Sequence, residues 1–261
     1  MISSRVSRRA LAAVLLALLP CLWAAAQDAI PAPIDLSGTW AEIQVCSELE
    51  TLPIVGRLTG TSTTLLRVVM EQTGNSLVIR ETYCSTKIDT GTVIASTAIP
   101  DAFLRSLGET ARPASLDLSG TAVRFVQPWY TEVRGAHLLD PENDPLPTSP
   151  DDPRVFDQDG DGKPGLTVRL RVMGIVSGEA YVVQRVRYRM TGTVVSPDRI
   201  DGLIEWTNEQ ITIGATNRLF EANTSGEPNP DAQKSYFVLQ RIDPSVTCTK
   251  IVKSWRSLFA R

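Results

Sequence analysis

Histidine is almost absent from this chain, because His137 is the only one among 261 residues. Its scarcity disfavours a histidine-rich zinc or iron site, and a Ser–His–Asp triad would depend on this one residue. No G-x-S-x-G elbow, phosphate-binding loop or dinucleotide-binding fingerprint occurs in the sequence either. The missing motifs favour a protein without enzymatic activity over an enzyme.

A basic surplus and long apolar runs are also lacking. The formal net charge is −3, and the negative charge gathers in residues 140–161, where eight acidic residues accompany one arginine. Nucleic-acid binding needs clustered Lys and Arg, so no nucleic-acid partner is expected. After residue 26 no segment approaches the roughly 20 apolar residues of a transmembrane helix, so no such helix is expected.

The first 26 residues have the three parts of a signal peptide. Arg5, Arg8 and Arg9 give a basic start, 11–23 is an apolar run, and alanines occupy 24–26. We therefore expect export to the periplasm or the extracellular medium, where association with the outer envelope is one arrangement. In its leader and sequence style the chain resembles exported proteins of Gram-negative bacteria. Sec export is favoured over the twin-arginine route.

Four cysteines are too few for a disulfide-dense scaffold. Cys21 lies in the leader, and lipid attachment there is disfavoured because a proline precedes it. An oxidising compartment favours one disulfide among Cys46, Cys84 and Cys248. The sequence does not fix the pair, but Cys84 with Cys248 is favoured, and the third cysteine is expected to be a buried thiol.

Short segments with strand periodicity recur along the chain and are separated by turn residues. The predicted strands are 38–46, 65–70, 77–83, 90–97, 114–118, 122–126, 129–133, 167–172, 182–190, 200–206, 211–213 and 236–242. A short helix is expected at 100–108, and another follows Asp243 as N-cap and Pro244 as first residue. The predicted fold class is mainly β, an antiparallel barrel or sandwich of about 9–11 strands with two short helices.

The expected organisation is a signal peptide at 1–26, a linker at 27–36, one β domain at 37–243 and a C-terminal helix at 244–261. An acidic loop at 139–165 interrupts the domain, and two β halves on either side of it are the alternative. Such long loops are usually functional or disordered.

The acidic loop contains three carboxylates at alternate positions, Asp157, Asp159 and Asp161, and Gly162 permits a tight turn after them. Oxygen ligands select a hard cation, so calcium is the predicted ion. The run from Asp157 to Gly165 resembles the calcium loops of EF-hands, dockerins and thrombospondin type 3 repeats. That resemblance implies side-chain ligands from the three aspartates and a carbonyl ligand from Lys163.

The calcium-loop resemblance has departures. Pro164 and Val168 stand where an EF-hand has its apolar residue and its bidentate Glu, so the loop is not an EF-hand. A missing carboxylate would have to come from elsewhere, and the candidates are Asp151, Asp152 and Glu179.

The segment Gly38-Thr39-Trp40 opens the first predicted strand. Gly-x-Trp at this place resembles the lipocalins and the wider calycin barrels. That resemblance implies a Trp packed across one end of a barrel, with an Arg from a late strand as its partner, and Arg241 is one candidate among several. The simpler interpretation of Trp40 is a core residue on an edge strand.

Three functions follow from these observations. The first is an exported, non-enzymatic β protein with a structural calcium loop, whose partner is unknown. The second is a lipocalin-like carrier of a small apolar ligand. The third is a glycoside hydrolase using Glu132, Glu179 or Glu205, although a Glu on a strand is more often the cross-strand partner of an Arg.

Overall fold

The computed structural model describes residues 34–52, 56–222 and 226–260. The chain divides into two units, Met1–Ile34 and Asp35–Arg261. The predicted signal peptide, with Cys21, and most of the predicted linker lie outside the described residues. All described strands and helices belong to the second unit, and Leu36, predicted to end the linker, is fully buried there.

The described residues of this unit form eleven strands, two α-helices and two short 3-10 helices, which confirms the predicted mainly antiparallel β class. The strands are β1 (Gly38–Leu52), β2 (Gly56–Thr73), β3 (Ser76–Asp89), β4 (Ala95–Ala98), β5 (Glu109–Asp117), β6 (Arg124–Arg134), β7 (Leu166–Val172), β8 (Val176–Ser196), β9 (Arg199–Ala215), β10 (Glu227–Pro228) and β11 (Tyr236–Arg241). The helices are α1 (Asp101–Ser106), α2 (Cys248–Leu258), η1 (Arg218–Phe220) and η2 (Ala232–Lys234).

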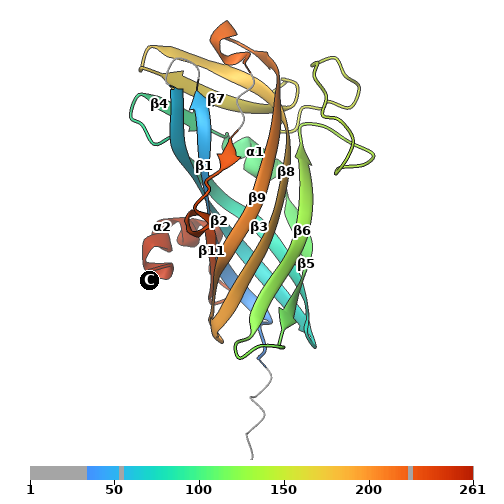
Figure 1. The fold of residues 1–261 in the computed structure, drawn as a ribbon, viewed down its shortest axis with the longest axis vertical. Helices are drawn as coiled ribbons and strands as arrows, with labels where there is room; N and C mark the ends of the chain where they lie inside the picture. Colours follow the sequence, from blue (N-terminus) through green and yellow to red (C-terminus); the bar gives the residue numbers. More distant parts are fainter. Residues whose placement is uncertain (1–33, 53–55, 223–225, 261) are drawn as a thin grey trace, which may run out of the picture. The chain divides into compact units, whose positions relative to one another are not determined.

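Eight of the strands close into a ring in chain order (Figure 1). The order is β1, β2, β3, β5, β6, β8, β9 and β11, and β11 pairs again with β1. Strands β7 and β4 branch from this ring, because β7 pairs with the first part of β8 and β4 pairs with β7. Strands from both sides of the acidic loop complete one ring, so the alternative of two separate β halves is wrong.

Three strand predictions need correction. Of the segment predicted at 90–97, only 95–97 is a strand, within β4, and residues 91–94 are bends. The two strands predicted at 200–206 and 211–213 are both part of β9. Likewise, 124–126 of the strand predicted at 122–126 and all of 129–133 belong to one strand, β6. A register shift between Gln127 and Tyr130 takes up Pro128, which has no N–H to donate to a ladder.

The C-terminal helix begins later than predicted. Its N-cap residue is Thr247, and helix α2 starts at Cys248. Asp243, the predicted N-cap, instead accepts hydrogen bonds from the backbone N–H and the hydroxyl of Ser245, at 2.9 and 2.5 Å. This aspartate therefore organises the turn before the helix, a local role that short polar side chains often have.

Strand β1 shows which of its two faces is inside the ring. The apolar residues Ala41, Ile43 and Val45 point outward and are covered by α2, where they pack with Ile251 in one buried cluster. The alternate residues, from Trp40 to Glu50, point into the ring. The predicted alternation is present, but helix α2 covers the outward-facing side.

A disulfide fixes helix α2 to the outside of the ring. Cys84 on β3 is bonded to Cys248, as the sequence favoured. Arg67 on β2 adds hydrogen bonds to the carbonyls of Pro244 and Val246, at 3.0 and 3.1 Å. The remaining thiol, Cys46, is half-buried and faces the ring interior, where burial raises its pKa to about 12.

One end of the ring is closed by Trp40, which is fully buried and donates its indole N–H to the carbonyl of Leu36 at 3.0 Å. The guanidinium of Arg241, on the last strand, lies 4.5 Å from the Trp40 ring and donates to the carbonyl of Ser37 at 2.6 Å. Gly38 has a φ of +131°, and a Cβ there would lie 2.8 Å from Arg241. The glycine of Gly-x-Trp is thus required by backbone conformation and by the approach of Arg241.

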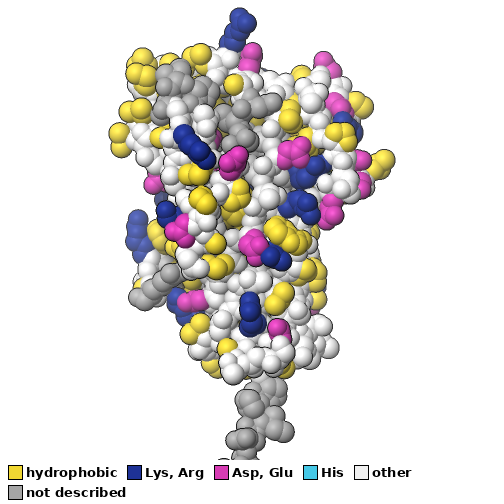
Figure 2. All heavy atoms as spheres, in the orientation of Figure 1, with side chains coloured by type: hydrophobic (Ala, Val, Ile, Leu, Met, Phe, Trp, Pro, Cys, Tyr) yellow, Lys and Arg dark blue, Asp and Glu magenta, His cyan; other side chains and the backbone are white. Residues whose placement is uncertain are grey.

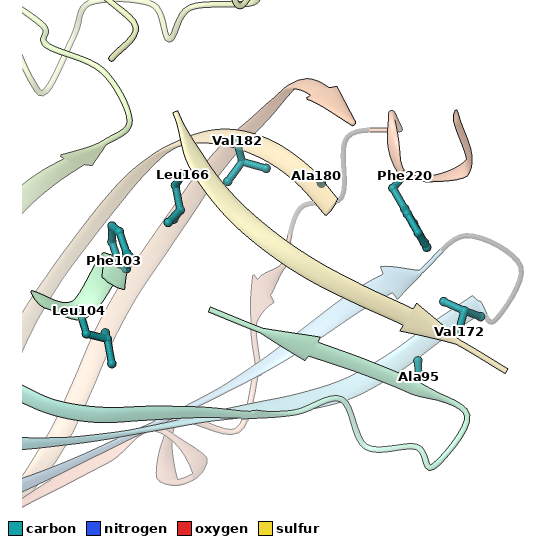
Figure 3. Packing of buried hydrophobic residues seen from close by; sticks show 8 residues of the cluster. All are labelled: Ala95, Phe103, Leu104, Leu166, Val172, Ala180, Val182 and Phe220. Carbon is teal, nitrogen blue, oxygen red and sulfur yellow. The ribbon is translucent and has the colours of Figure 1, made fainter. Parts of the chain in front are cut away.

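At the other end, α1, β4, β7, η1 and the start of β8 converge over the interior (Figure 3). The buried members of this cluster are Ala95, Phe103, Leu104, Leu166, Val172, Ala180, Val182 and Phe220. Helix α1 is short, and it places Phe103 and Leu104 against the interior of the ring.

The surface carries mixed charge on the face that Figure 2 shows, with Lys and Arg side chains interspersed among Asp and Glu. No broad surface of one sign covers that face. In the part of the chain that the structure describes, no helix has the length and apolarity to cross a membrane.

Candidate functional site

The interior of the ring holds two adjoining cavities. The larger has a volume of about 190 Å³ and the smaller about 110 Å³. The residues that line both are Glu48, Ile88, Ile99, Gln184 and Asn208, so these side chains form the wall that the two cavities share. The smaller cavity lies against the cluster in Figure 3, because Ala95, Val172, Val182 and Phe220 line it.

The larger cavity has aromatic and polar walls. Its aromatic residues are Tyr83 on β3, Phe103 on α1, Tyr188 on β8 and Trp206 on β9. The indole N–H of Trp206 donates to the Ser235 hydroxyl at 3.2 Å, which fixes the ring. Alternate residues of each strand point to one face, and this period brings side chains that are far apart in the sequence to a common interior.

Several polar atoms of this wall have no partner in the described part of the chain. They are Oε1 of Gln184, Oδ1 of Asn208 and the hydroxyl of Tyr188, all of them buried. The carboxylates of Glu48 and Glu50 are half-buried and make no hydrogen bond or ion pair with a described residue. Burial, reinforced by the nearby Glu50, raises the pKa of Glu48 to about 7.

Below this cavity, towards the Trp40 end, the ring is filled by an ionic cluster around Arg112. This arginine is 1% exposed, and its guanidinium lies 3.3 Å from the Glu81 carboxylate and 3.5 Å from that of Glu132. The same guanidinium lies 4.5 Å from the ring of Tyr130 and 4.6 Å from that of Tyr188. Arg112 therefore has both ionic and aromatic partners, which a buried charge requires.

The charges in this cluster nearly balance. Three carboxyl groups, those of Glu42, Glu81 and Glu132, accompany two arginines, Arg112 and Arg134. Burial favours the neutral form of Glu132, but Arg134 at 2.7 Å and Arg112 outweigh it and lower the pKa of this carboxyl. Burial, with Glu81 nearby, raises the pKa of Glu42 to about 8. Burial also raises the pKa of Glu81, although Arg112 lies 3.3 Å from it. Glu42 is thus protonated at neutral pH, and Glu81 is shifted in the same direction.

The acidic loop brings its three predicted ligands together. Asp157, Asp159 and Asp161 each offer a carboxylate oxygen, and these oxygens lie within 4.8 Å of one another. Asp157 accepts hydrogen bonds from the backbone N–H groups of Gly160 and Gly162, both at 2.8 Å, which shapes the turn. The geometry fits oxygen ligation of one hard cation.

Asp159 is the most informative of the three. It is 8% exposed, its Oδ2 accepts from the Thr167 backbone N–H at 3.2 Å, and its Oδ1 is buried without a partner. Burial and the carboxylates of Asp161 and Asp157 raise its pKa. Thr167 on β7 also donates its hydroxyl to Asp161 at 2.7 Å, so it anchors the loop to the sheet. Sequence reasoning missed Thr167, although its place on the strand directly after the loop was a signal.

The other predicted ligands do not join this group in the structure. Asp152 is held by Arg154, whose hydrogen bonds lower its pKa to about 2. Glu179 forms an ion pair with Arg169 at 3.4 Å, and Asp151 is exposed outside the group. The backbone N–H of Lys163 donates to Asp161 at 2.9 Å, so Lys163 shares the loop with the aspartates. Its role as a carbonyl ligand stays a prediction.

The three glutamates considered for glycoside hydrolysis lie in different environments. Glu132 belongs to the ionic cluster, Glu179 is opposite Arg169, and Glu205 is opposite Arg189 at 2.7 Å. The last two are cross-strand partners of arginines, as predicted for a Glu on a strand. His137 is exposed and stacks on Phe156, with ring centroids 4.1 Å apart.

Comparison of the chain with protein-family models, with curated protein sequences and with solved structures gives no match.

Proposed function

We propose that this protein is an exported, non-enzymatic binding protein that carries a small ligand inside its ring. The observation that carries the proposal is the interior space next to the Glu48 carboxylate, Oε1 of Gln184 and Oδ1 of Asn208, because these oxygens have no partner among the described residues. Buried polar groups without partners cost free energy, so a site that keeps them is built for a ligand or for water.

The size of the cavity limits the ligand. A cavity of about 150 Å³ is known to hold a benzene-sized molecule. The larger cavity, with about 190 Å³, therefore suits a compound with one ring. The smaller cavity adjoins it and leaves room for a short substituent.

The lipocalin-like interpretation gains support from Trp40 and Arg241. The late-strand arginine that the resemblance implies is present, since Arg241 on β11 lies over the Trp40 ring. Eight strands in ring order can hold one small ligand. The Cys84–Cys248 disulfide suits an oxidising compartment, which supports the proposed export.

A pair of neighbouring substitutions tests ligand binding. Thr64 lines the larger cavity, and Thr63, one residue before it on β2, points to the opposite face. We expect neutral one-ring probes, namely toluene, indole and 2-phenylethanol, to bind the wild type in ligand-observed NMR. Thr64→Phe should abolish this binding and Thr63→Phe should preserve it. Absence of binding to the wild type, or equal binding to Thr64→Phe, would contradict the proposal.

A second proposed function is calcium binding by the loop from Asp157 to Asp161. The specific observation in its favour is the buried Oδ1 of Asp159, which has no partner among the described residues. Because the loop is joined to β7 through Thr167, an ion there would stabilise the loop against the sheet. We assign the ion a structural role.

Thermal unfolding tests the calcium site. At a calcium concentration about 100-fold above Kd, binding adds about 2.7 kcal/mol, which raises Tm by roughly 5 °C or more for a chain of this size. Asp159→Asn should remove the shift, and Glu109→Gln, an exposed carboxyl on β5, should retain it. Equal Tm values in calcium and in chelator for the wild type would exclude the site.

A further inference from the structure

The walls of the interior space are rich in oxygen acceptors and poor in free cations. Glu48 and Glu50 enter it from β1 without an ion pair, and the buried oxygens of Gln184 and Asn208 face the same space. The side-chain nitrogen of Gln184 is already used, because it donates to Gln210 at 2.5 Å. Because these oxygens accept hydrogen bonds, the complementary ligand is one that donates them.

The cationic side chains that line the cavities do not neutralise these acceptors. Arg134 is held by Glu132 at 2.7 Å. Arg171 is exposed, and no ion pair joins it to Glu48 or Glu50. In the larger cavity an anionic ligand such as a carboxylate would meet the unpaired carboxyl group of Glu48 and no free cation, and Glu50 adds a second unpaired carboxyl group in the adjoining smaller cavity. The electrostatics therefore disfavour an anion and favour a cation.

Aromatic rings surround the larger cavity on several strands. A cation is attracted to the face of a tryptophan or tyrosine, and the attraction is stronger where water is excluded. Trp206 and Tyr83 line this cavity. Tyr188 lines it too; Arg112 already lies over its ring at 4.6 Å, but its hydroxyl is buried without a partner among the described residues. The side chains that line the larger cavity thus offer both an apolar surface and hydrogen-bond acceptors.

We infer that the ligand is a small organic cation, a protonated amine attached to one ring. Its ammonium group donates to the Glu48 carboxylate and to the oxygens of Gln184 and Asn208. Its ring packs among the aromatic side chains of the larger cavity. The inference rests on the proposed ligand binding and adds the charge and the chemical class of the ligand.

A charge series on a common ring tests the inference. The probes are three amines (benzylamine, phenethylamine and cyclohexylmethylamine), the neutral 2-phenylethanol and the anion of 3-phenylpropionic acid, measured by calorimetry at pH 8. We expect at least one amine to bind about tenfold more tightly than 2-phenylethanol, because a charged donor meets a buried carboxylate. The anion should bind most weakly.

Two further measurements connect the effect to Glu48. Glu48→Gln should lower amine affinity about tenfold and leave 2-phenylethanol unchanged, whereas Glu71→Gln, in an exposed ion pair with Arg80, should change neither. In the wild type, amine affinity should rise as pH increases through 7, because Glu48 becomes ionised there. The other titratable or cationic side chains that line the cavities are Cys46, Glu50, Tyr83, Tyr188, Arg134 and Arg171.

The outcomes separate this inference from the function on which it rests. If the neutral probe binds and no amine binds more tightly, the amine assignment is wrong and interior binding stands. If no probe of any charge binds, both fail. A Glu48→Gln variant that keeps full amine affinity would also overturn the assignment, and the wild-type pH series gives an answer even if that variant does not fold.

Discussion

The two halves of the ring interior differ in how their charged groups are compensated. In the half next to Trp40, Arg112 is 1% exposed and lies against Glu81, Glu132 and two tyrosine rings. In the other half, the Glu48 carboxylate and the side-chain oxygens of Gln184 and Asn208 surround a cavity and have no partner among the described residues. The first half is filled and its carboxylates face arginines, although buried atoms of Glu81, Arg112 and Gln127 make no hydrogen bond there. The second half is hollow, and its carboxylate has no cationic partner.

Because of this difference, the filled half is expected to contribute to stability and the hollow half to ligand binding. A buried ion pair fixes its side chains, and removal of one partner leaves a buried charge uncompensated. A hollow region lined by unpaired polar groups contributes little to the free energy of unfolding, and those groups remain available to a ligand. Substitutions in the two halves should therefore have effects of different size.

The largest effect is expected for Arg112→Met. The variant should lose about 3–5 kcal/mol of unfolding free energy in urea, because buried Glu81 loses its arginine partner and Glu132 keeps only Arg134. Arg189→Met breaks the exposed pair with Glu205 and should cost less than about 1 kcal/mol. Similar losses in the two variants would show that the ionic cluster does not stabilise the filled half. The double variant with Glu81→Gln should lose less than the sum of the two single changes.

Glu42→Gln should have the next largest effect, in the opposite direction. The pKa of Glu42 is raised from an ordinary 4.5 to about 8, by burial and by Glu81, against the opposing influence of Arg112. Its contribution to stability is therefore complete below pH 4.5 and is lost as pH rises through 8. Glutamine does not ionise, so the variant should be more stable than the wild type by roughly 3 kcal/mol at pH 7 and equal at pH 4.

Urea unfolding at a series of pH values measures this difference. The matched variant is Glu71→Gln, whose carboxyl is exposed, and its stability should follow the wild type at every pH. A Glu42→Gln curve parallel to that of the wild type from pH 4 to pH 8 would show that Glu42 is not a protonated member of the cluster.

The smallest effect is expected in the hollow half. Asn208→Val removes an oxygen that has no partner and introduces a residue favoured in strands. The unfolding free energy should stay within about 1 kcal/mol of the wild type or rise slightly. A loss above about 2 kcal/mol would mean that this half also depends on its polar groups for stability, and the contrast between the halves would not hold.

The sequence pattern predicted the positions of the strands better than the position at which the C-terminal helix begins. Strand periodicity predicted 65–70 and 77–83, which pair as parts of β2 and β3, and 182–190 within β8, because periodicity is a local property. The full lengths of β8 and β9 were not predicted, and β9 was predicted as two strands. The helix start after Asp243 was wrong, since a short polar side chain organises a turn as readily as it caps a helix. Favouring Cys84 with Cys248 was right, although spacing alone does not determine a pair.

The two candidate sites also differ in how far the sequence could predict them. Asp157, Asp159 and Asp161 are neighbours in the chain, so their spacing was enough to predict that they meet. Glu48, Gln184 and Asn208 come from three strands far apart in the sequence, and only closure of the ring brings them together. Glu48 and Asn208 lie outside the predicted strands, and Gln184 lies inside the one predicted at 182–190. Even there, a period of 2 indicates that a strand has two faces and does not indicate which face is enclosed.

By itself the sequence determined a mainly antiparallel β protein with a long acidic loop, because turn chemistry, periodicity and the spacing of three aspartates are encoded locally. Only the tertiary structure decided that helix α2 covers the outward face of β1, and that glutamates predicted on a half-buried strand lie inside the ring. The reason is physical. Helix α2, attached through Cys84, buries Ala41, Ile43 and Val45 from outside, while Arg112 compensates the carboxyl groups within, and both depend on contacts between distant segments.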